Sequence, residues 1–382
     1  MSIIQASITG DIDTMIRLLQ DPNLNPASED SLAIVEACKN GHVEIVRILL
    51  TDRRADPAAR HSEALSLASS MGHTEIVRML LADRRANPGS HESDALSWAS
   101  SRGHPEIVRM LLDDGRADPA DEESNALSWA SDEGYTEIVQ MLLDDGRSNP
   151  EADDSFALRY ASDSGHTEIV KMLLKDNRAN PAVRENAPII YACDNDHVKV
   201  VELLVADRRV DPAARDNAPI IYACMNGHVE LVRMLLANGR ANPAAQTNIA
   251  IQHASSNGHA EVVRMLLADR RVDPAAEAIR EVVVNERLPM HIRKLFIRDS
   301  RVRRALGDSI PPECIQAWRE VLTDLQIFYN VYKQQVQPLL GLGYDGIQMH
   351  ILTGTDFISN YSINIDRPYT EQIRIFIADF SE

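Results

Sequence analysis

A fixed interval of 31 residues constrains this 382-residue chain more than any other feature. Glycines recur at this interval, at positions 10, 41, 72, 103, 134, 165, 227 and 258, and Asp196 replaces one of them. Prolines keep the same interval, each directly after an Asp or Asn, at positions 26, 57, 88, 119, 150, 181, 212, 243 and 274. Two markers in one register predict nine copies of one module that stack into a solenoid, because each copy buries its apolar face only against its neighbours.

The copy at residues 57–87 shows how one module folds. Apolar residues at helical spacing between Ser62 and Gly72 predict a short first helix, and residues 73–81 predict a second one. The position of Ser62 carries Ser or Asn in the other copies, and these residue types are typical helix N-caps. Gly72 is typical of a left-handed C-terminal cap.

Two short helices, a Gly-His-x-Glu turn between them and an Asp-Pro connection resemble the ankyrin repeat. A weakened form of the family's Thr-Pro-Leu-His-x-Ala signature stands at residues 187–192 and 218–223, as Ala-Pro-Ile-Ile-Tyr-Ala. The copies are 31 residues long instead of the usual ~33. Because proline cannot donate to a β-ladder, we expect tight loops rather than long β-fingers between the copies. Such shortened Asp-Pro repeats look like those in ankyrin proteins of large DNA viruses, protists and intracellular bacteria.

The copies end near residue 304, after a worn tenth copy in which residues 292–299 follow the apolar pattern of residues 262–269. We therefore predict a mainly α chain in two parts. Residues 1–304 form an ankyrin-repeat solenoid of nine repeats and a degenerate C-terminal capping repeat. Residues 305–382 form a small α+β C-terminal domain.

The C-terminal part begins with a predicted amphipathic helix after Pro311 and Pro312. Its apolar seam has spacings of three and four residues and comprises Ile315, Trp318, Leu322, Leu325, Tyr329, Tyr332 and Val336. A seam this short favours packing on the last repeat, or within its own small domain, over pairing between molecules. Alternation at period two predicts short strands at 347–352, 360–365 and 372–378.

Positions that vary at a fixed phase of the first helix are the candidate contact positions. The phase of Leu67 lies opposite Leu65 and Ala68 on a helical wheel, and it becomes aromatic along the array. The members of this aromatic ladder are Trp98, Trp129, Tyr160, Tyr191 and Tyr222. Trp and Tyr are frequent interface hot spots, so the ladder is a candidate partner-binding stripe. Stacking between neighbouring repeats is the alternative that the sequence leaves open.

Acidic residues are concentrated beside the ladder, since residues 113–163 hold fifteen acidic and three basic residues. The candidate partner-binding acids are Asp121, Glu122, Glu123, Asp132, Glu133, Asp153, Asp154 and Asp163. This charge favours a protein partner with a basic or polar contact segment, and solvated loop charge is the alternative. The net charge of −18 opposes binding to nucleic acid or an anionic membrane.

Seven of the twelve histidines occupy the position after the repeated glycine, but their spacing does not favour a metal site. Stacked copies lie about 10 Å apart, so their imidazoles cannot share one ion with ligand bonds of ~2 Å. We predict structural hydrogen bonds for these rings. The arginines that recur from Arg54 to Arg271 predict a structural ladder with neighbouring Asp residues. No catalytic residue, metal or cofactor is predicted.

These patterns predict a noncatalytic scaffold or adaptor that binds a protein along the inner groove of the repeat array. A structural component of a virion or other large assembly is the alternative, with self-association through the C-terminal domain left open. Residues 310–313 also faintly resemble the start of an F-box, which would recruit a ubiquitin ligase. Cysteines without paired spacing and the lack of a secretory or membrane signal predict a cytoplasmic protein, in the host cytoplasm or virion if viral, that is not secreted.

Overall fold

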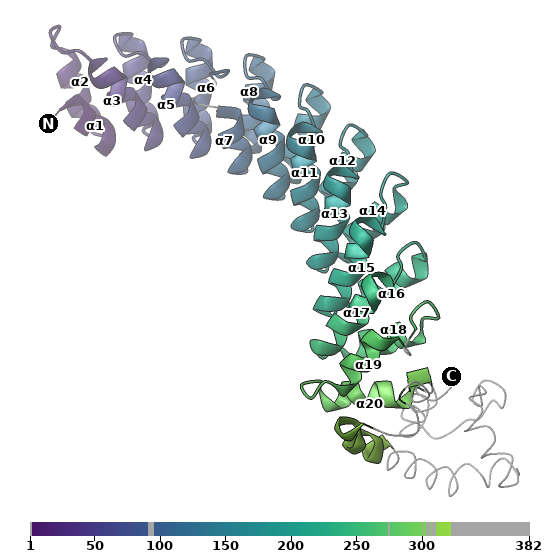
Figure 1. Cartoon of the computed structure of the whole chain (residues 1–382). Coiled ribbons are helices and arrows are strands. Elements are labelled where there is room, and N and C mark those ends of the chain that lie inside the picture. Colours follow the sequence, from purple (N-terminus) through teal and green to yellow (C-terminus); the bar gives the residue numbers. More distant parts are fainter. Residues whose placement is uncertain are drawn as a thin grey trace, which may run out of the picture. The chain divides into compact units, whose positions relative to one another are not determined.

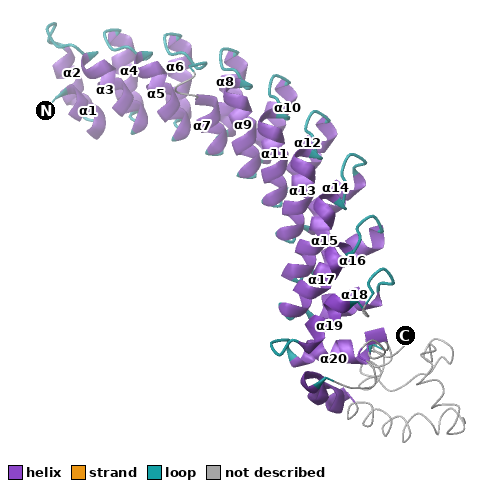
Figure 2. Ribbon diagram, viewed as in Figure 1, coloured by secondary structure: helices purple, strands orange, loops and turns teal. Residues whose placement is uncertain are grey.

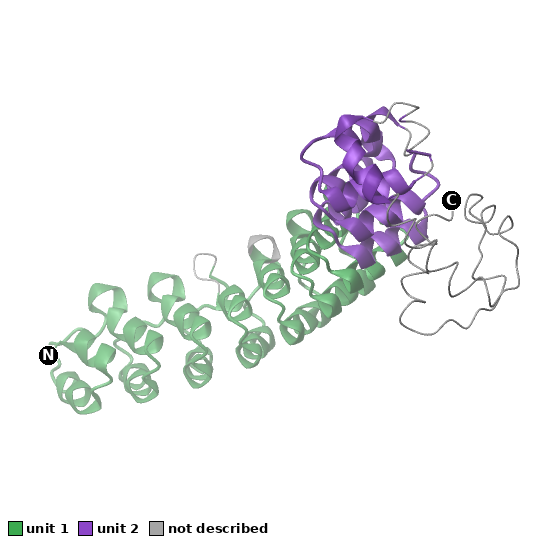
Figure 3. Cartoon of the chain, turned by 90° about the horizontal axis from the view of Figure 1, so that it is seen from below, with its two compact units in different colours: residues 1–210 green, residues 211–382 purple. Residues whose placement is uncertain are grey.

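The computed structural model describes residues 2–90, 95–273, 276–299, 301–302, 306 and 311–321. Helices and their connecting turns make up all of these residues, and none of them lies in a strand (Figure 2). The chain divides into two compact units, residues 1–210 and residues 211–382 (Figure 3). The all-helical array agrees with the sequence prediction for the repeats. The predicted strands near the C-terminus lie outside the described residues.

Successive helix pairs build the first unit, one pair for each repeat (Figure 1). They are α1 (Ile3–Thr9) and α2 (Ile12–Leu19), α3 (Ser28–Lys39) and α4 (Val43–Asp52), α5 (Ala59–Ser70) and α6 (Thr74–Asp83), α7 (Ala95–Ser101) and α8 (Pro105–Asp114), α9 (Asp121–Asp132) and α10 (Thr136–Asp145), α11 (Ala152–Asp163) and α12 (Thr167–Asp176), and α13 (Val183–Asp194) and α14 (Val198–Ala206). Each first helix packs on the next first helix, and each second helix on the next second helix. The unit therefore consists of a first-helix layer and a second-helix layer.

The second unit continues the same arrangement within itself. Its helices are α15 (Ala214–Asn226) and α16 (Val229–Asn238), α17 (Ala245–Ser256) and α18 (Ala260–Ala268), and α19 (Glu277–Val284) and α20 (Met290–Arg298). The last pair is the worn tenth copy, and its Ile279, Val283, Ile292 and Phe296 are fully buried. These apolar residues let the pair close the stack, because they supply the face that the preceding repeat packs against.

The core of each repeat lies between its two helices. In the copy of α5 and α6, Leu65 and Ala68 of the first helix and Ile76, Val77 and Leu80 of the second have no exposed surface. The outward pair Glu75 and Arg78, three residues apart, forms an ion pair of 3.2 Å. The helical phases read from the sequence are therefore those of the structure.

The first helices begin differently from the sequence prediction. Arg60, His61 and Ser62 have positive φ values of 52°, 56° and 66°, so the chain makes a left-handed turn before the right-handed helix. The Oγ of Ser62 accepts a hydrogen bond of 2.8 Å from the backbone N–H of Asn87 in the next connection. Equivalent bonds join Ser31 to Asp56 and Ser155 to Asn180. The predicted N-cap was therefore wrong, because this hydroxyl joins neighbouring repeats instead of capping its own helix.

The Asp-Pro and Asn-Pro connections are closed by the side chain before the proline. The Oδ1 of Asn87 accepts from the backbone N–H of Gly89 at 3.2 Å, and the Oδ1 of Asp56 accepts from Ala58 at 2.9 Å. Such a side-chain bond to the N–H two residues on replaces a backbone turn. It explains why a short connection needs Asp or Asn at this position. The predicted tight loops are confirmed in the described residues.

The repeated histidines pack on the repeated glycines of the preceding copy. His104 lies against Gly72, which has a φ of 77°, and a Cβ at Gly72 would come within 2.7 Å of the imidazole. The Nε2 of His104 makes a 3.1 Å hydrogen bond with the backbone carbonyl of Ser70. Further pairs of this kind are His42 with Ile8, His73 with Lys39, His166 with Asp132, His197 with Asp163 and His259 with Met225. The predicted structural hydrogen bonds are confirmed.

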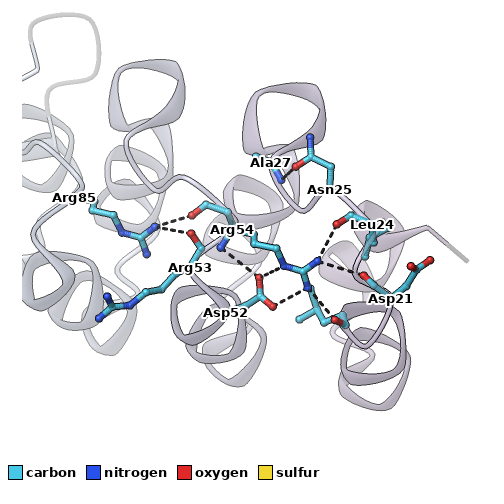
Figure 4. Close-up of polar contacts among 10 residues, drawn as sticks. Asp21, Leu24, Asn25, Ala27, Asp52, Arg53, Arg54 and Arg85 are labelled. Carbon is cyan, nitrogen blue, oxygen red and sulfur yellow. Dashed lines mark hydrogen bonds and ion pairs between the residues drawn. The ribbon is translucent and has the colours of Figure 1, made fainter.

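The repeated arginines form the predicted ladder (Figure 4). The guanidinium of Arg54 pairs with both oxygens of Asp52, at 2.7 and 2.9 Å, and donates to the backbone carbonyls of Leu19 and Leu24 in the preceding repeat, at 2.8 and 2.9 Å. The hydrogen bond from Arg54 holds the pKa of Asp52 below its ordinary value. The same pairing with Asp recurs at Arg85, Arg116, Arg147, Arg178, Arg209 and Arg271. Each arginine thus ties one connection to the connection before it.

Residues 312–321 form a helix that contacts the last helix pair. Lys294 and Glu320 form an ion pair of 2.7 Å, and Arg293 donates a 2.9 Å hydrogen bond to the carbonyl of Glu313. Packing of this segment on the last repeat is therefore confirmed for its described residues.

The buried face of this helix differs from the predicted seam. Cys314, Ala317 and Val321 are buried, whereas Ile315 is 38% exposed and Trp318 is half-buried. Small residues allow the backbone to approach the repeat closely, as the 3.7 Å contact between the Cys314 Sγ and the carbonyl of Val283 shows. The prediction that the first turns of this helix pack through Ile315 and Trp318 was therefore wrong. Its later members, from Leu322 to Val336, lie outside the described residues.

Candidate functional site

Two tryptophans of the aromatic ladder lie on the surface of the first-helix layer. Trp98 of α7 is 47% exposed and Trp129 of α9 is 42% exposed. Their helices pack on each other, and Leu96 and Leu127, two positions earlier, are buried. The helical phase therefore directs the leucines into the core and leaves two neighbouring indoles at the surface.

Trp129 belongs to an aromatic cluster that crosses a repeat boundary. Its ring meets Phe156 of α11 edge to face, with centroids 5.7 Å apart and an interplanar angle of 63°. Phe156 stacks on Tyr160 with centroids 4.0 Å apart and an angle of 19°. Such pairs stabilise their arrangement by about 0.5–1.5 kcal/mol beyond the burial of area. The aromatic cluster, Trp129, Phe156 and Tyr160, thus packs between repeats and still exposes part of its indole.

A buried arginine packs against two rings of this cluster. The guanidinium of Arg159 lies 5.6 Å from the centroid of Phe156 and 5.5 Å from that of Tyr160, and the residue is only 3% exposed. It donates hydrogen bonds to the backbone carbonyls of Asp154 and Asp153, at 2.9 and 2.8 Å. These bonds stabilise the left-handed turn at the start of α11. They also fix the guanidinium in its position against the rings of Phe156 and Tyr160.

Phe156 and Arg159 were missed by the sequence reasoning. The signal was present, because the phase of Arg159 is serine in the three preceding copies, at Ser66, Ser97 and Ser128. A large cation directly after three copies with serine marks a local change of packing.

The acidic residues fall into two groups at opposite ends of the first helices. The first group, called here the helix-end acids, is Asp132, Glu133 and Asp163. Burial raises the pKa of Asp132 most, and the neighbouring charges of Glu133 and Asp163 raise it further. Asp163 accepts a 2.8 Å hydrogen bond from the side-chain amide of Asn195. These carboxylates are close enough to repel one another, and Asp132 lies one helical turn after Trp129.

The second group lies at the starts of the first helices and is already paired in part. Asp153 and Asp154 are exposed, and Arg184 of the next repeat contacts them at 3.9 and 2.9 Å. Asp121 is half-buried at the start of α9. The side chains of Glu122 and Glu123 lie outside the described residues. Acidic residues that are close in the sequence therefore lie at opposite ends of the first helices.

The remaining ladder members differ in exposure. Tyr160 and Tyr191 are half-buried in α11 and α13 of the first unit. Tyr222 is 36% exposed in α15 of the second unit. Within the first unit the structure thus brings together Trp98, Trp129 and Tyr160 with the helix-end acids, and Phe156 joins them.

The remaining observations concern metal ligands, thiols and membrane-spanning helices. In the part of the chain that the structure describes, no three His, Cys, Asp or Glu side chains are grouped to hold a metal ion. Burial raises the pKa of the thiols of Cys38, Cys193 and Cys224. No helix among the described residues has the length and apolar character needed to cross a membrane.

Comparison with known families places the repeats. The sequence model of the family described as ankyrin repeats (3 copies) matches four successive stretches, residues 3–91, 84–154, 147–216 and 209–278. No curated protein matches the chain. The matched stretches cover the nine regular copies.

Proposed function

Because the chain belongs to the ankyrin repeat family, whose members generally serve as protein-binding scaffolds, we propose that it is a noncatalytic adaptor that binds a protein partner on its first-helix layer. The binding surface is the stripe of Trp98, Trp129 and Tyr160 with the helix-end acids. One observation carries this proposal: two neighbouring indoles are more than two fifths exposed in a layer whose other large apolar residues are mostly buried.

The exposed indoles supply the apolar part of the contact. Fully burying a large aromatic side chain is worth about 1.5–3 kcal/mol, and tryptophan is the residue most enriched in interface hot spots. Trp129 is also fixed in place by its contact with Phe156, so little side-chain entropy is lost when a partner covers it. A rigid, partly exposed ring is therefore a favourable anchor for a partner.

The helix-end acids supply the polar part of the contact. Burial is the main cause of the raised pKa of Asp132, and the negative charges of Glu133 and Asp163 add to it. A lysine or arginine of the partner placed beside these carboxylates would relieve that repulsion. The partner segment is thus basic, with an apolar side chain next to the basic one, and its association slows as salt is added.

Asp153 and Asp154 contribute less to this contact, although they lie in the same acidic stretch of the sequence as the others. Arg184 already neutralises part of their charge, and the buried Arg159 donates hydrogen bonds to their backbone carbonyls. A partner cation there would compete with Arg184. The proposed site is therefore centred on Trp129 and the helix-end acids, with Tyr191 of the first unit as its extension. Tyr222 belongs to the second unit and stays a separate predicted contact position.

The test uses a displayed library of random peptides selected on the immobilised full chain. The expected result is enrichment of peptides that carry Lys or Arg next to an apolar residue. Binding of these peptides should weaken about tenfold or more in Trp129→Ala, and several-fold in the pair D132N/D163N. The matched control is E137Q/E168Q, which removes two charges from exposed positions on the second helices of the same repeats.

Two outcomes would overturn the proposal. Either no peptide is enriched over a bare support, or the enriched peptides bind D132N/D163N and E137Q/E168Q equally. Circular dichroism and urea unfolding of each variant separate lost binding from lost folding. If Trp129→Ala unfolds at a lower urea concentration than the wild type, Trp129→Phe replaces it.

The finer features of the sequence reading stay predictions. They are the shortened Asp-Pro subtype, an origin in a large DNA virus, protist or intracellular bacterium, and a cytoplasmic location. A structural role in a virion and recruitment of a ubiquitin ligase through residues 310–313 also stay predictions. Self-association through residues 305–382 would favour the structural role over the adaptor.

A further inference from the structure

An exposed apolar patch lies on the first repeat. It is formed by Ile12 and Ile16 of α2, which are four residues apart on one helix face and are 40% and 46% exposed. Ile8 of α1 is also 40% exposed. The corresponding position of Ile16 is charged or polar in the later copies, as in Arg47, Arg78, Arg109 and Gln140. The first repeat reads Ile16-Arg17 where the second reads Arg47-Ile48, so the apolar and the charged residue have changed places. This exchange moves an isoleucine from the half-buried face of the helix to its outer face.

A surface depression adjoins this patch on the second-helix layer. It has a volume of about 410 Å³ and lies between α2 and α4. It is lined by the apolar residues Ile16, Leu19 and Ile48 and by the polar residues Gln20, Arg47, Thr51 and Asp52. A space of this size is large enough to receive an apolar side chain from another molecule.

The charges beside the patch are arranged to complement a second copy of the same helix. Asp13 lies near the start of α2 and Arg17 near its end, and both are exposed. They are four residues apart, so they form a charged row next to the row of Ile12 and Ile16. In an antiparallel pair of α2 helices, each Asp13 faces the Arg17 of the other copy, and the two helix dipoles also oppose each other favourably.

We propose that two copies of this chain associate through α2, antiparallel about a two-fold axis. The isoleucines of one copy cover those of the other, and each depression receives an apolar side chain of the opposite copy. Two identical Asp13–Arg17 pairs border the contact. A patch that is both apolar and self-complementary in charge fits this isologous arrangement.

Sedimentation velocity of the full chain over a range of concentrations tests this proposal. The wild type should pass from monomer to dimer as the concentration rises. The variant I16R/R17I should stay monomeric over the same range. It reproduces the order Arg47-Ile48 of the second repeat, so its helix keeps a sequence that folds in this array.

A charge-exchange experiment tests the antiparallel pairing itself. D13R places two arginines opposite each other, and R17D places two aspartates opposite each other, so each variant alone should dimerise about tenfold more weakly. An equimolar mixture of the two variants restores both pairs with opposite charges. The mixture should therefore form a heterodimer at concentrations at which each variant is a monomer.

Each remaining outcome overturns the proposal. A wild type that is monomeric at every concentration removes the dimer. A dimer that I16R/R17I leaves intact places the contact elsewhere, and a chain lacking residues 305–382 then shows whether the C-terminal part makes it. A mixture that does not associate, although both variants have wild-type circular dichroism, refutes the antiparallel arrangement.

Discussion

Replacement of Arg85 by alanine tests whether the arginine ladder holds neighbouring repeats together. The guanidinium pairs with both oxygens of Asp83, at 2.6 and 3.0 Å. It also donates to the carbonyl of Ala55 at 2.9 Å and to that of Arg53 at 3.4 Å, both in the preceding connection. The variant removes all of these bonds and leaves Asp83 without its hydrogen-bonded cation.

The expected loss of stability follows from these contacts. A hydrogen bond that involves a charged group contributes about 1.5–3 kcal/mol when it is well buried. The Arg85 side chain is 34% exposed, so solvent screening lowers its contribution. We expect Arg85→Ala to cost about 2 kcal/mol. Arg85→Lys should cost about 1 kcal/mol, because lysine keeps the charge and loses the planar fork.

Arg78→Ala is the matched control. Arg78 also contacts two acidic side chains, Glu75 at 3.2 Å and Glu106 at 3.1 Å, but its side chain is 54% exposed and these contacts involve no backbone carbonyl. Its loss should cost less than about 0.5 kcal/mol. Urea unfolding followed by circular dichroism gives the comparison, and native-state hydrogen exchange locates the loss, since long repeat arrays need not unfold in one step. Equal destabilisation by Arg85→Ala and Arg78→Ala would refute the reasoning.

The same ladder predicts sensitivity to acid. The hydrogen bond from Arg85 lowers the pKa of Asp83 from its ordinary value of 3.8, and each other Asp of the ladder from Asp52 to Asp269 is lowered in the same way. A lowered pKa contributes stability above 3.8 that is lost as the pH falls through the folded-state pKa. The wild type should therefore lose stability steeply below about pH 4, and Arg85→Ala less steeply. Urea midpoints measured from pH 6 to pH 2 compare the two slopes, and parallel slopes would contradict the linkage.

Three further substitutions or reactions test other parts of the scaffold. Thr247→Gly should raise the free energy of unfolding by about 1 kcal/mol, because Thr247 has a φ of 59° that a β-branched residue adopts at a cost, and a drop in the urea midpoint would contradict this. Gly72→Ala should destabilise by more than Gly115→Ala, since an added methyl meets the His104 ring at 2.7 Å in the first and nothing within 4 Å in the second, and equal urea midpoints would show that the ring moves aside freely. The buried thiol of Cys38, whose pKa is raised, should react with iodoacetamide only after unfolding, and rapid labelling of the native chain would show that its repeat opens.

Much of the fold was readable from the sequence because each contact between repeats is made many times. The structural hydrogen bond of His104 and the pairing of Arg85 with Asp83 were predicted correctly, since a residue type that recurs at one phase makes the same contact in successive copies. The packing of His104 on Gly72 was not predicted. The phase of Ser62 was also noticed but was given the wrong role. Its hydroxyl accepts a hydrogen bond from the backbone N–H of Asn87, 25 residues away. Only the three-residue left-handed turn brings the two groups together. Local propensity does not predict such a turn, because non-glycine residues adopt it at a cost that the contact between repeats offsets.

The candidate surface was readable only in part, for a related physical reason. Trp98 and Trp129 were assigned correctly to the outer face because helical phase alone decides it. The division of the acids required the positions of both helix ends and of Arg184, which sequence distance does not give. The contact of Arg159 with the aromatic cluster was not predicted. Predicting it requires interpreting an arginine at a position that is serine in the three preceding copies as a change of packing.

Departures from phase therefore mark the two surfaces that this chain offers. At Arg159 a cation stands where the three preceding copies carry serine, and it packs against Phe156 and Tyr160 beside Trp129 on the first-helix layer. At Ile16 an isoleucine replaces an arginine, and the result is an apolar patch on the second-helix layer. Because the two surfaces belong to different layers, a dimer formed through α2 leaves both Trp129 stripes uncovered. Two partner sites in one dimer raise the effective concentration of a partner's second binding segment, so a partner with two such segments is held more tightly than either site alone would hold it.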